Sequence, residues 1–147
     1  MNQALQGKLK DAAARPLTAL HRELYRRSGG RIGGRIGKLQ HLLLTTTGRK
    51  SGQPRTTPLN YGTDGDRIIL VASWGGDDRA PQWYQNLVAN PEVTVLIGTE
   101  TRRMRAATAS PEEKPRLWSL MTAGYPGYDD YQRKTERDIP VVVLTPI

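Results

Sequence analysis

Residues 42–59 read LLLTTTGRKSGQPRTTPL and contain two β-strand patterns separated by a turn. Leucine and β-branched threonine fill residues 42–47, which is typical of a short strand. Two glycines then interrupt the pattern. Residues 55–61 predict a second strand, whose pairing Pro58 restricts because proline cannot donate a backbone hydrogen bond. The segment between the two strands is therefore expected to be a loop at one end of a sheet.

Similar strand patterns recur further along the chain, with turn signals between them. The pair Asp64-Gly65 predicts a hairpin turn, and residues 67–73 predict the strand that returns from it. Further strands are expected at residues 93–97, 101–109 and 141–144. These patterns give about six short strands, mostly antiparallel.

Two short helices are expected in the connections between the strands. One covers residues 81–89 and has a proline at its start. The other covers residues 110–123 and begins with Ser110-Pro111-Glu112-Glu113, which has the pattern of a capping box. Residues 125–140 are expected to form a long polar and aromatic loop with room for one short helix.

The N-terminal region has a different pattern. Leucines at helical spacing predict a helix over residues 4–27, which Pro16 should break or kink. Residues 28–38 contain two copies of Gly-Gly-Arg-Ile-Gly and are expected to be either a flexible connector or an ordered loop. We therefore divide the chain into a basic helix with its glycine-rich connector, residues 1–40, and a sheet domain, residues 41–147.

These elements predict an α+β fold whose sheet closes into a small barrel or half-open barrel. The apolar strand runs supply the expected core, namely Leu42–Leu44, Ile68–Val71, Val93–Ile97 and Val141–Leu144. One helix precedes the barrel, and two lie in its connections.

Composition excludes several kinds of protein. The 147 residues carry a net charge of +8 and no cysteine, so disulfides and cysteine-ligated metals are excluded. The two histidines, His21 and His41, are too few and too far apart in sequence for a convincing metal site. We see neither a secretory signal nor an apolar run long enough to span a bilayer, and we expect a cytoplasmic protein.

The positive charge is concentrated in the first 60 residues, whose net charge is +10, whereas the remainder carries −2. Phosphates, anionic lipids and nucleic acids are the partners that such a region attracts. Aromatic side chains that could stack on bases are nearly absent from this basic part, which argues against a nucleic-acid-binding module.

The loop of residues 48–55 carries the clearest functional pattern. Arg49, Lys50 and Arg55 place three cations within seven residues, and no acid lies nearby in the sequence. The two glycines allow the backbone to curl, and the hydroxyl groups of neighbouring serine and threonine residues add donors. This combination predicts a cradle for phosphate or for several carboxylates. A solvated basic turn is the alternative.

Two aromatic segments follow. Residues 73–76, Ser-Trp-Gly-Gly, end a strand, and the helix at residues 81–89 adds Trp83 and Tyr84, so a flat ring could lie against this wall. Trp83 could equally well pack that helix against the barrel. Residues 125–131 hold three tyrosines that would share one face of a helical turn and could supply hydrogen bonds or a proton. For Tyr131 we favour a packing role.

No cysteine, Ser/His/Asp set or carboxylate pair supplies a reactive group, so an enzyme with this sequence would need a cofactor. Four segments closely resemble the deazaflavin-dependent nitroreductase family of actinobacteria: residues 42–59, 71–76, 83–91 and 125–128. The resemblance runs from about residue 20 to the C-terminus. It implies a split β-barrel that uses reduced coenzyme F420, an 8-hydroxy-5-deazaflavin with a phosphate and an oligoglutamate tail.

The family resemblance also implies function and site. It implies hydride transfer to quinones, nitro compounds or activated alkenes such as enones, with Ser73 and Tyr125 as the catalytic residues. Ser73 would hydrogen-bond near the reactive part of the ring, and Tyr125 would face the acceptor and donate a proton. The cofactor-binding residues that it implies are Leu44, Thr45, Arg49, Lys50, Ser51, Gly52, Gln53, Pro54, Arg55, Val71, Ala72, Ser73, Trp74, Gln82, Trp83, Tyr84, Asn86 and Tyr128.

Some expectations remain open at this point. Some family members have lysine where this chain has Trp74, so the acceptor range is not carried over. In relatives the N-terminal segment can associate peripherally with membrane, and a basic amphipathic helix here would allow contact with the inner face of the membrane. The alternative is a helix that lies on the barrel. A flavin mononucleotide enzyme on the same class of barrel is the main alternative for the cofactor.

Overall fold

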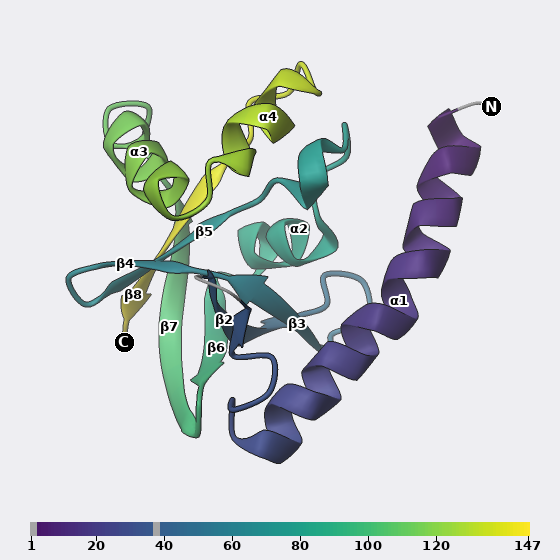
Figure 1. Cartoon of the computed structure of the whole chain (residues 1–147). Helices are drawn as coiled ribbons and strands as arrows, with labels where there is room; N and C mark the ends of the chain where they lie inside the picture. Colours follow the sequence, from purple (N-terminus) through teal and green to yellow (C-terminus); the bar gives the residue numbers. More distant parts are fainter. Residues whose placement is uncertain (1–2, 37–38) are drawn as a thin grey trace.

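The computed structural model describes residues 3–36 and 39–147 (Figure 1). Its helices are α1 (Gln3–Ser28), η1 (Trp74–Gly76, a 3-10 turn), α2 (Gln82–Ala89), α3 (Lys114–Gly124) and α4 (Gly127–Arg133). Its strands are β1 (Arg35–Ile36), β2 (Leu39–Thr47), β3 (Pro54–Asn60), β4 (Gly62–Asp64), β5 (Arg67–Val71), β6 (Glu92–Ile97), β7 (Glu100–Thr108) and β8 (Val141–Pro146).

The strands form one curled antiparallel sheet in the order β1-β2-β6-β7-β8-β5-β4, and β3 pairs with β2 off this path. This arrangement confirms the predicted α+β fold with a half-open, mostly antiparallel barrel. The sheet of the described residues has eight strands rather than about six, because β1 and β4 are too short to give a sequence pattern. Three α-helices lie in the connections: α2 and α3, and α4, which is the short helix that residues 125–140 had room for.

The sheet separates two apolar clusters. Alternate residues of β5 point to opposite faces, so Leu70 packs inside the barrel whereas Ile69 packs outside it. The inner cluster includes Leu42, Leu44 and Trp83. The outer cluster lies between the sheet and the helices α3 and α4. The four strand runs predicted as core all contribute buried residues.

Helix α1 lies along the outside of the barrel (Figure 1). Tyr25 anchors its C-terminal end: the side chain is 1% exposed, and its hydroxyl donates to the Leu96 carbonyl at 3.2 Å and accepts from the Gly98 N–H at 2.8 Å. The helix continues through Pro16, so the predicted break is wrong. Proline has a φ that suits a helix, and Pro16 is exposed, so water can reach the carbonyl that its missing N–H leaves unpaired.

Two further predictions need local correction. The strand before the Asp64-Gly65 turn is β4, which pairs with β5, whereas β3 pairs only with β2 among the described strands. Helix α3 begins at Lys114, four residues later than predicted. The Glu113 N–H does donate to the Ser110 hydroxyl at 3.2 Å, but the Glu113 carboxylate pairs with Arg67 instead of completing the capping box.

The described part of the glycine-rich connector is an ordered loop. The Gly30 N–H donates to the Tyr25 carbonyl at 2.9 Å, and the Ile32 N–H donates to the Ser28 hydroxyl at 2.8 Å. A Cβ on Gly34 would lie 2.1 Å from the Gly30 carbonyl oxygen, so this close approach requires glycine. Residues 37–38 of the connector lie outside the described residues.

Candidate functional site

The cation loop, residues 48–55, closes between β2 and β3. The Gly48 N–H donates to the Gln53 carbonyl at 2.8 Å, and the Gly52 N–H donates to the Gly48 carbonyl at 2.8 Å. A Cβ on Gly48 would lie 2.6 Å from the Ser51 hydroxyl oxygen, and Gly52 has a φ of +71°. Gly52 is therefore required by its left-handed backbone, and Gly48 is favoured because a Cβ there would also lie 3.1 Å from the Gln53 carbonyl oxygen.

One cation of this loop is used within the protein. The Arg49 guanidinium donates to the Asn86 side-chain oxygen at 2.9 Å, and the Asn86 amide donates to the Thr46 hydroxyl at 3.2 Å. Asn86 is only 4% exposed, so it joins α2 to the base of the loop. Lys50 and Arg55 are exposed and form no ion pair with any residue that the structure describes. Their charges remain available to an anion.

Ser73 and Trp74 follow β5 and begin η1. Ser73 is 8% exposed, and Trp74 has a φ of +46°, the left-handed conformation that no other non-glycine residue has in the described parts of the chain. Arg137 holds this turn: its guanidinium donates to the carbonyls of Ala72 at 3.1 Å, Ser73 at 2.9 Å and Asp77 at 2.9 Å. Burial lowers the pKa of Arg137.

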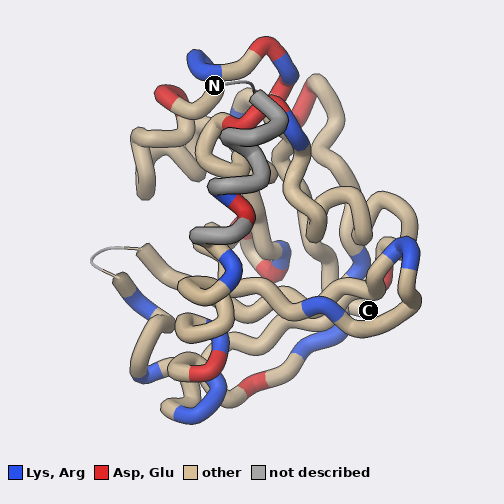
Figure 2. The backbone as a smooth tube through the Cα atoms, turned by 90° about the vertical axis from the view of Figure 1, so that its right-hand side faces the viewer, with Lys and Arg blue, Asp and Glu red and all other residues tan. Residues whose placement is uncertain are grey.

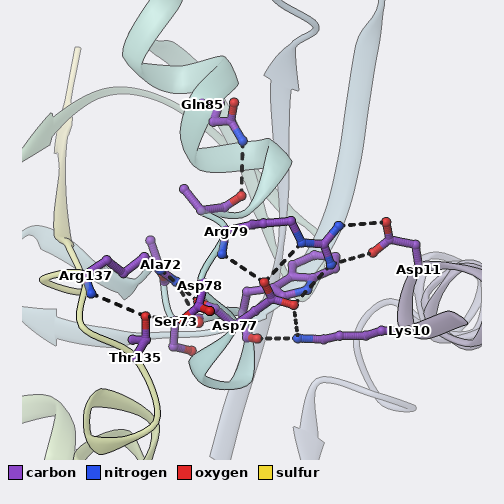
Figure 3. A network of polar contacts seen from close by, with 12 residues as sticks. Lys10, Asp11, Ala72, Ser73, Asp77, Asp78, Arg79, Gln85, Thr135 and Arg137 are labelled. Atoms are coloured by element: carbon purple, nitrogen blue, oxygen red, sulfur yellow. Dashed lines mark hydrogen bonds and ion pairs between the residues drawn. The ribbon is translucent and has the colours of Figure 1, made fainter. Parts of the chain in front are cut away.

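The residues after η1 form a paired charge network with α1 (Figure 3). Asp77 accepts hydrogen bonds from Arg79 and from Lys10, at 3.1 and 3.3 Å, and Arg79 also pairs with Asp11 at 3.1 Å. The hydrogen bond from Arg79 is the main reason why the pKa of Asp77 lies well below its usual range. Asp77 and Arg79 thus join α1 to the loop, whereas Asp78 accepts a hydrogen bond from the Thr135 hydroxyl at 2.8 Å.

The three tyrosines of residues 125–131 do cluster. The hydroxyls of Tyr125 and Tyr131 are 2.6 Å apart, and the Tyr128 hydroxyl accepts from the Asn60 amide at 2.8 Å. The rings of Tyr125 and Tyr128 meet edge to face at 4.9 Å. The hydrogen bond with Tyr125, followed by burial, raises the pKa of Tyr131 to about 12. Tyr131 therefore has a polar contact in addition to the packing role that we favoured.

The outer face of the barrel connects these parts. Successive side chains of a strand point to opposite faces. Leu59 packs into the inner cluster, so Thr56 and Asn60, which lie three residues and one residue from it, point outward. The Thr56 hydroxyl lies 2.8 Å from that of Thr45 and 3.2 Å from the Arg26 guanidinium of α1, while Asn60 contacts Tyr128 of α4. About 13 Å of strand separates the two positions, since each residue adds about 3.3 Å.

Other predicted site residues lie elsewhere. Leu44, Ala72 and Trp83 are buried in the inner cluster, so Trp83 does pack α2 against the barrel. The Tyr84 hydroxyl lies 2.9 Å from that of Thr108 on β7, on the side of α2 away from Asn86. Val71 packs beside the tyrosines in the outer cluster. Gln82, Ser51, Gly52, Gln53 and Pro54 are exposed.

Sequence reasoning missed several residues that surround this face. They are Lys10, Arg22, Arg26, Asn60 and Arg137. The charge count did point to the first 60 residues, which hold four of them. Figure 2 views the side on which α1 lies and shows basic residues along it. Nothing in the sequence indicated that α1 would bring them to β3 and η1.

The histidines also differ from expectation. The rings of His21 and His41 lie 5.2 Å apart, so the argument from their separation in sequence was wrong. Still, the described residues contain no group of three or more His, Cys, Asp or Glu side chains arranged to hold a metal ion. Among the described helices, none combines the length and the apolarity needed to cross a bilayer.

The site suits a flat ring with an anionic extension. Exposed cations with no acidic partner among the described residues lie on the cation loop, and aromatic side chains and hydroxyls lie along the outer face. The Trp74 indole N–H is buried and has no partner among the described residues, which leaves one donor unused. Such a constellation suits an enzyme whose reactive group is supplied by a bound cofactor.

Comparisons with known proteins specify this class. The family model of the F420H(2)-dependent quinone reductases matches residues 17–146, and the chain belongs to this family. The F420H(2)-dependent quinone reductase Rv1261c of Mycobacterium tuberculosis is 47% identical over 133 residues, which cover 88% of this chain and 89% of that protein. A solved F420-H2 dependent reductase, FDR-A, is 41% identical with a TM-score of 0.66, covering 71% of this chain and 92% of that one.

The protein is therefore an oxidoreductase that depends on reduced coenzyme F420. This confirms the resemblance stated from the sequence and the deazaflavin as cofactor, and it favours the deazaflavin over flavin mononucleotide.

Proposed function

We propose that the protein transfers hydride from reduced coenzyme F420 to a quinone and also to nitro compounds or activated alkenes, with Ser73 and Tyr125 as catalytic residues. When bound, the cofactor supplies the hydride. The hydroxyl pair of Tyr125 and Tyr131, 2.6 Å apart beside the outer face, is the observation that carries this proposal. All three acceptor classes become anionic on accepting hydride, so each needs a proton donor.

The cofactor would lie along the outer face with its phosphate at the cation loop. Lys50 and Arg55 would bind the phosphate, since charge-assisted hydrogen bonds to phosphate are the strongest available to these side chains. The Trp74 indole N–H is buried and has no hydrogen-bond partner among the described residues. This donor would bind a polar atom of the cofactor ring.

Tyr125 would hold the proton that the acceptor needs. Its phenolic O–H is a hydrogen-bond donor and can act as a general acid. Tyr131 has a pKa raised to about 12, so it remains protonated and can donate to the Tyr125 oxygen once that proton has left.

The test of Tyr125 is Tyr125→Phe, which keeps the ring and removes the hydroxyl. We expect turnover with menadione and with a nitroimidazole to fall about 10²-fold, the low end for general acid catalysis, with near-normal F420 binding. Tyr131→Phe should have a smaller effect. Full activity of Tyr125→Phe on both acceptors would eliminate its role as donor.

Ser73 would orient the ring. Ser73→Ala should lower the single-turnover rate of hydride transfer more than it lowers the affinity for F420, because the contact counts mainly in the transition state. Equal losses in rate and in affinity, or no loss, would leave Ser73 with a structural role only. Tryptophan quenching by F420, flavin mononucleotide and NADPH measures the affinities and tests the choice of cofactor.

We also propose a cytoplasmic protein whose α1 contacts the inner face of the membrane. Leu17, Leu20 and Leu24 are 69%, 57% and 39% exposed and share one face of α1, while basic residues flank them. Co-sedimentation with anionic vesicles should be strong for the native chain and weak for a Leu17→Ser/Leu20→Ser variant. Equal sedimentation of both proteins would contradict membrane contact through this face.

A further inference from the structure

The N-terminal half of α1 contacts the residue next to Ser73. The Lys10 ammonium donates to the Trp74 carbonyl at 2.6 Å and lies 5.0 Å from the centroid of the Trp74 ring. It also pairs with the Asp77 carboxylate at 3.3 Å. One cation thus contacts the backbone of Trp74, its side chain and the end of the same turn. The Lys10–Trp74 contact spans 64 residues of sequence.

Trp74 needs such support. Its φ of +46° brings Cβ close to the backbone, a conformation that costs any residue other than glycine free energy and persists only when the surroundings hold it. Gly75 and Gly76, which follow with φ of +64° and +85°, bear no such cost. Arg137 holds the carbonyls on either side of Trp74, those of Ser73 and Asp77, whereas Lys10 holds Trp74 itself.

We propose that Lys10 is a positioning residue of the hydride-transfer site: its ammonium holds Trp74 in the left-handed conformation and so fixes the Ser73 hydroxyl and the Trp74 indole N–H, the two groups that would contact the deazaflavin. This inference rests on the roles proposed above for Ser73 and Trp74. Helix α1 is then part of the catalytic structure. It fixes the geometry of the turn at Ser73 and Trp74, which lies far from it in the sequence and contacts it only in the folded protein.

The alternative is that Lys10 only docks α1 on the barrel. The neighbouring Asp11 provides the matched comparison, since it joins the same turn of α1 to the same loop through Arg79, at 3.1 Å, without contacting Trp74. The chain offers a second control on α3. There the Lys114 ammonium lies 5.6 Å from the Trp118 centroid and pairs with Asp138, so the Lys–Trp–Asp combination recurs away from Ser73.

The experiment compares Lys10→Met, which keeps the aliphatic stem, with Asp11→Asn and Lys114→Met. For Lys10→Met we expect about a tenfold slower single-turnover hydride transfer, the order of effect of a lost backbone constraint, with an F420 dissociation constant within about twofold of the native value. Asp11→Asn and Lys114→Met should stay within about twofold in both measurements. Lys10→Arg should restore most of the rate because it keeps the charge.

Fluorine NMR of the protein labelled with fluorotryptophan adds a readout that needs no cofactor. The resonance of Trp74, assigned with Trp74→Phe, should shift in Lys10→Met and remain in place in Asp11→Asn. In a Trp74→Asn background, Lys10→Met should have no further effect on the rate, since asparagine adopts the left-handed conformation more readily. This double-mutant comparison keeps the test valid if Lys10→Met alone loosens α1.

The outcomes separate the inference from the proposed function. A native protein that does not oxidise reduced F420 would refute the proposed function, while the NMR comparison would still test the contact. Equal rate losses in Lys10→Met and Asp11→Asn would mean docking alone and overturn the inference. An unchanged Trp74 resonance in Lys10→Met would overturn it as well.

Discussion

Two loops near the outer face of the barrel use charge in opposite ways. In the cation loop, Lys50 and Arg55 are exposed and have no acidic partner among the described residues. In the η1 loop, residues 73–79, the charges of Asp77 and Arg79 are all paired with one another or with α1. The first loop therefore keeps its charge for an anionic ligand, whereas the second uses its charge to hold the backbone and to dock a helix.

The difference has a simple physical basis. A surface ion pair contributes little by itself, but several pairs on one turn restrict its conformation. Unpaired cations do not stabilise the fold, because they repel one another. Their repulsion is offset only when an anion binds. Variants of the η1 loop should thus change stability, and variants of the cation loop should change cofactor binding.

The largest effect on stability is expected for Arg137→Met. The carbonyl oxygens of Ala72, Ser73 and Asp77 lose a charged donor, and we expect the free energy of unfolding to fall by about 2–3 kcal/mol. Urea denaturation followed by circular dichroism measures it. Arg133→Met is the control, because Arg133 is exposed and its one ion pair among the described residues is with Asp130. If the two variants unfolded at the same urea concentration, the hydrogen bonds of Arg137 would not hold the loop.

Lys50→Ala and Arg55→Ala should show the reverse pattern. Each should weaken F420 binding by about 1–3 kcal/mol if the side chain makes one charge-assisted hydrogen bond to the cofactor, and neither should change the unfolding free energy. The loss should be larger at low salt because screening is weaker. Arg103→Ala, an exposed change on β7, controls for net charge. Unchanged affinity in both loop variants would refute the phosphate cradle.

The sequence predicted those features that depend on neighbouring residues. The apolar run of β5, the Asp64-Gly65 turn and the two glycines of the cation loop each act within a few residues, so their pattern is visible in the sequence. The cation loop was found in this way, and its three cations lie where two strands end. The division of the β5 run between an inner and an outer cluster was not predicted, because all four of its side chains are apolar.

The sequence did not predict how α1 lies on the barrel. Tyr25 contacts Leu96, 71 residues away, and Lys10 contacts Trp74, 64 residues away. Such contacts depend on the closed barrel and leave no periodic signal. The same holds for Asn60, whose amide contacts Tyr128 across 68 residues. Resemblance to a family supplied the cofactor, which the residue patterns alone had left as an anionic ligand with a flat ring.

A smaller effect on stability is expected on acidification, and it arises from Asp77 in the η1 loop. The pKa of Asp77 is lowered in the fold, so its stabilisation is present above the ordinary carboxyl pKa of about 4 and is lost as the pH falls below it. Asp77→Asn should therefore unfold less steeply with falling pH than the native chain does. Denaturation midpoints between pH 5 and pH 3 measure the slope, and an identical slope would contradict this pairing.

The smallest expected effect on the unfolding free energy concerns His41, which lies at the contact between α1 and β2 and is disfavoured in its charged form. Burial, followed by the charge of the neighbouring His21, lowers the pKa of His41, so the fold disfavours the protonated form of this histidine. The unfolded chain takes up the proton first, at a pKa of about 6.5, and stability is lost as the pH falls below that value. We expect the unfolding free energy of the native chain to decline from pH 7 to pH 5, and His41→Gln to remove most of that decline.

His21→Gln is the comparison, because it also removes the hydrogen bond to the Gly33 carbonyl at 2.7 Å and so lowers stability across the whole range. A decline as steep in His41→Gln as in the native chain would show that another group causes it. If the unfolding free energy of His41→Gln stayed constant from pH 7 to pH 5, the contact between α1 and the barrel at this point would depend on an uncharged His41. That would contrast with the paired charges of the η1 loop and with the charges of the cation loop, which have no acidic partner among the described residues.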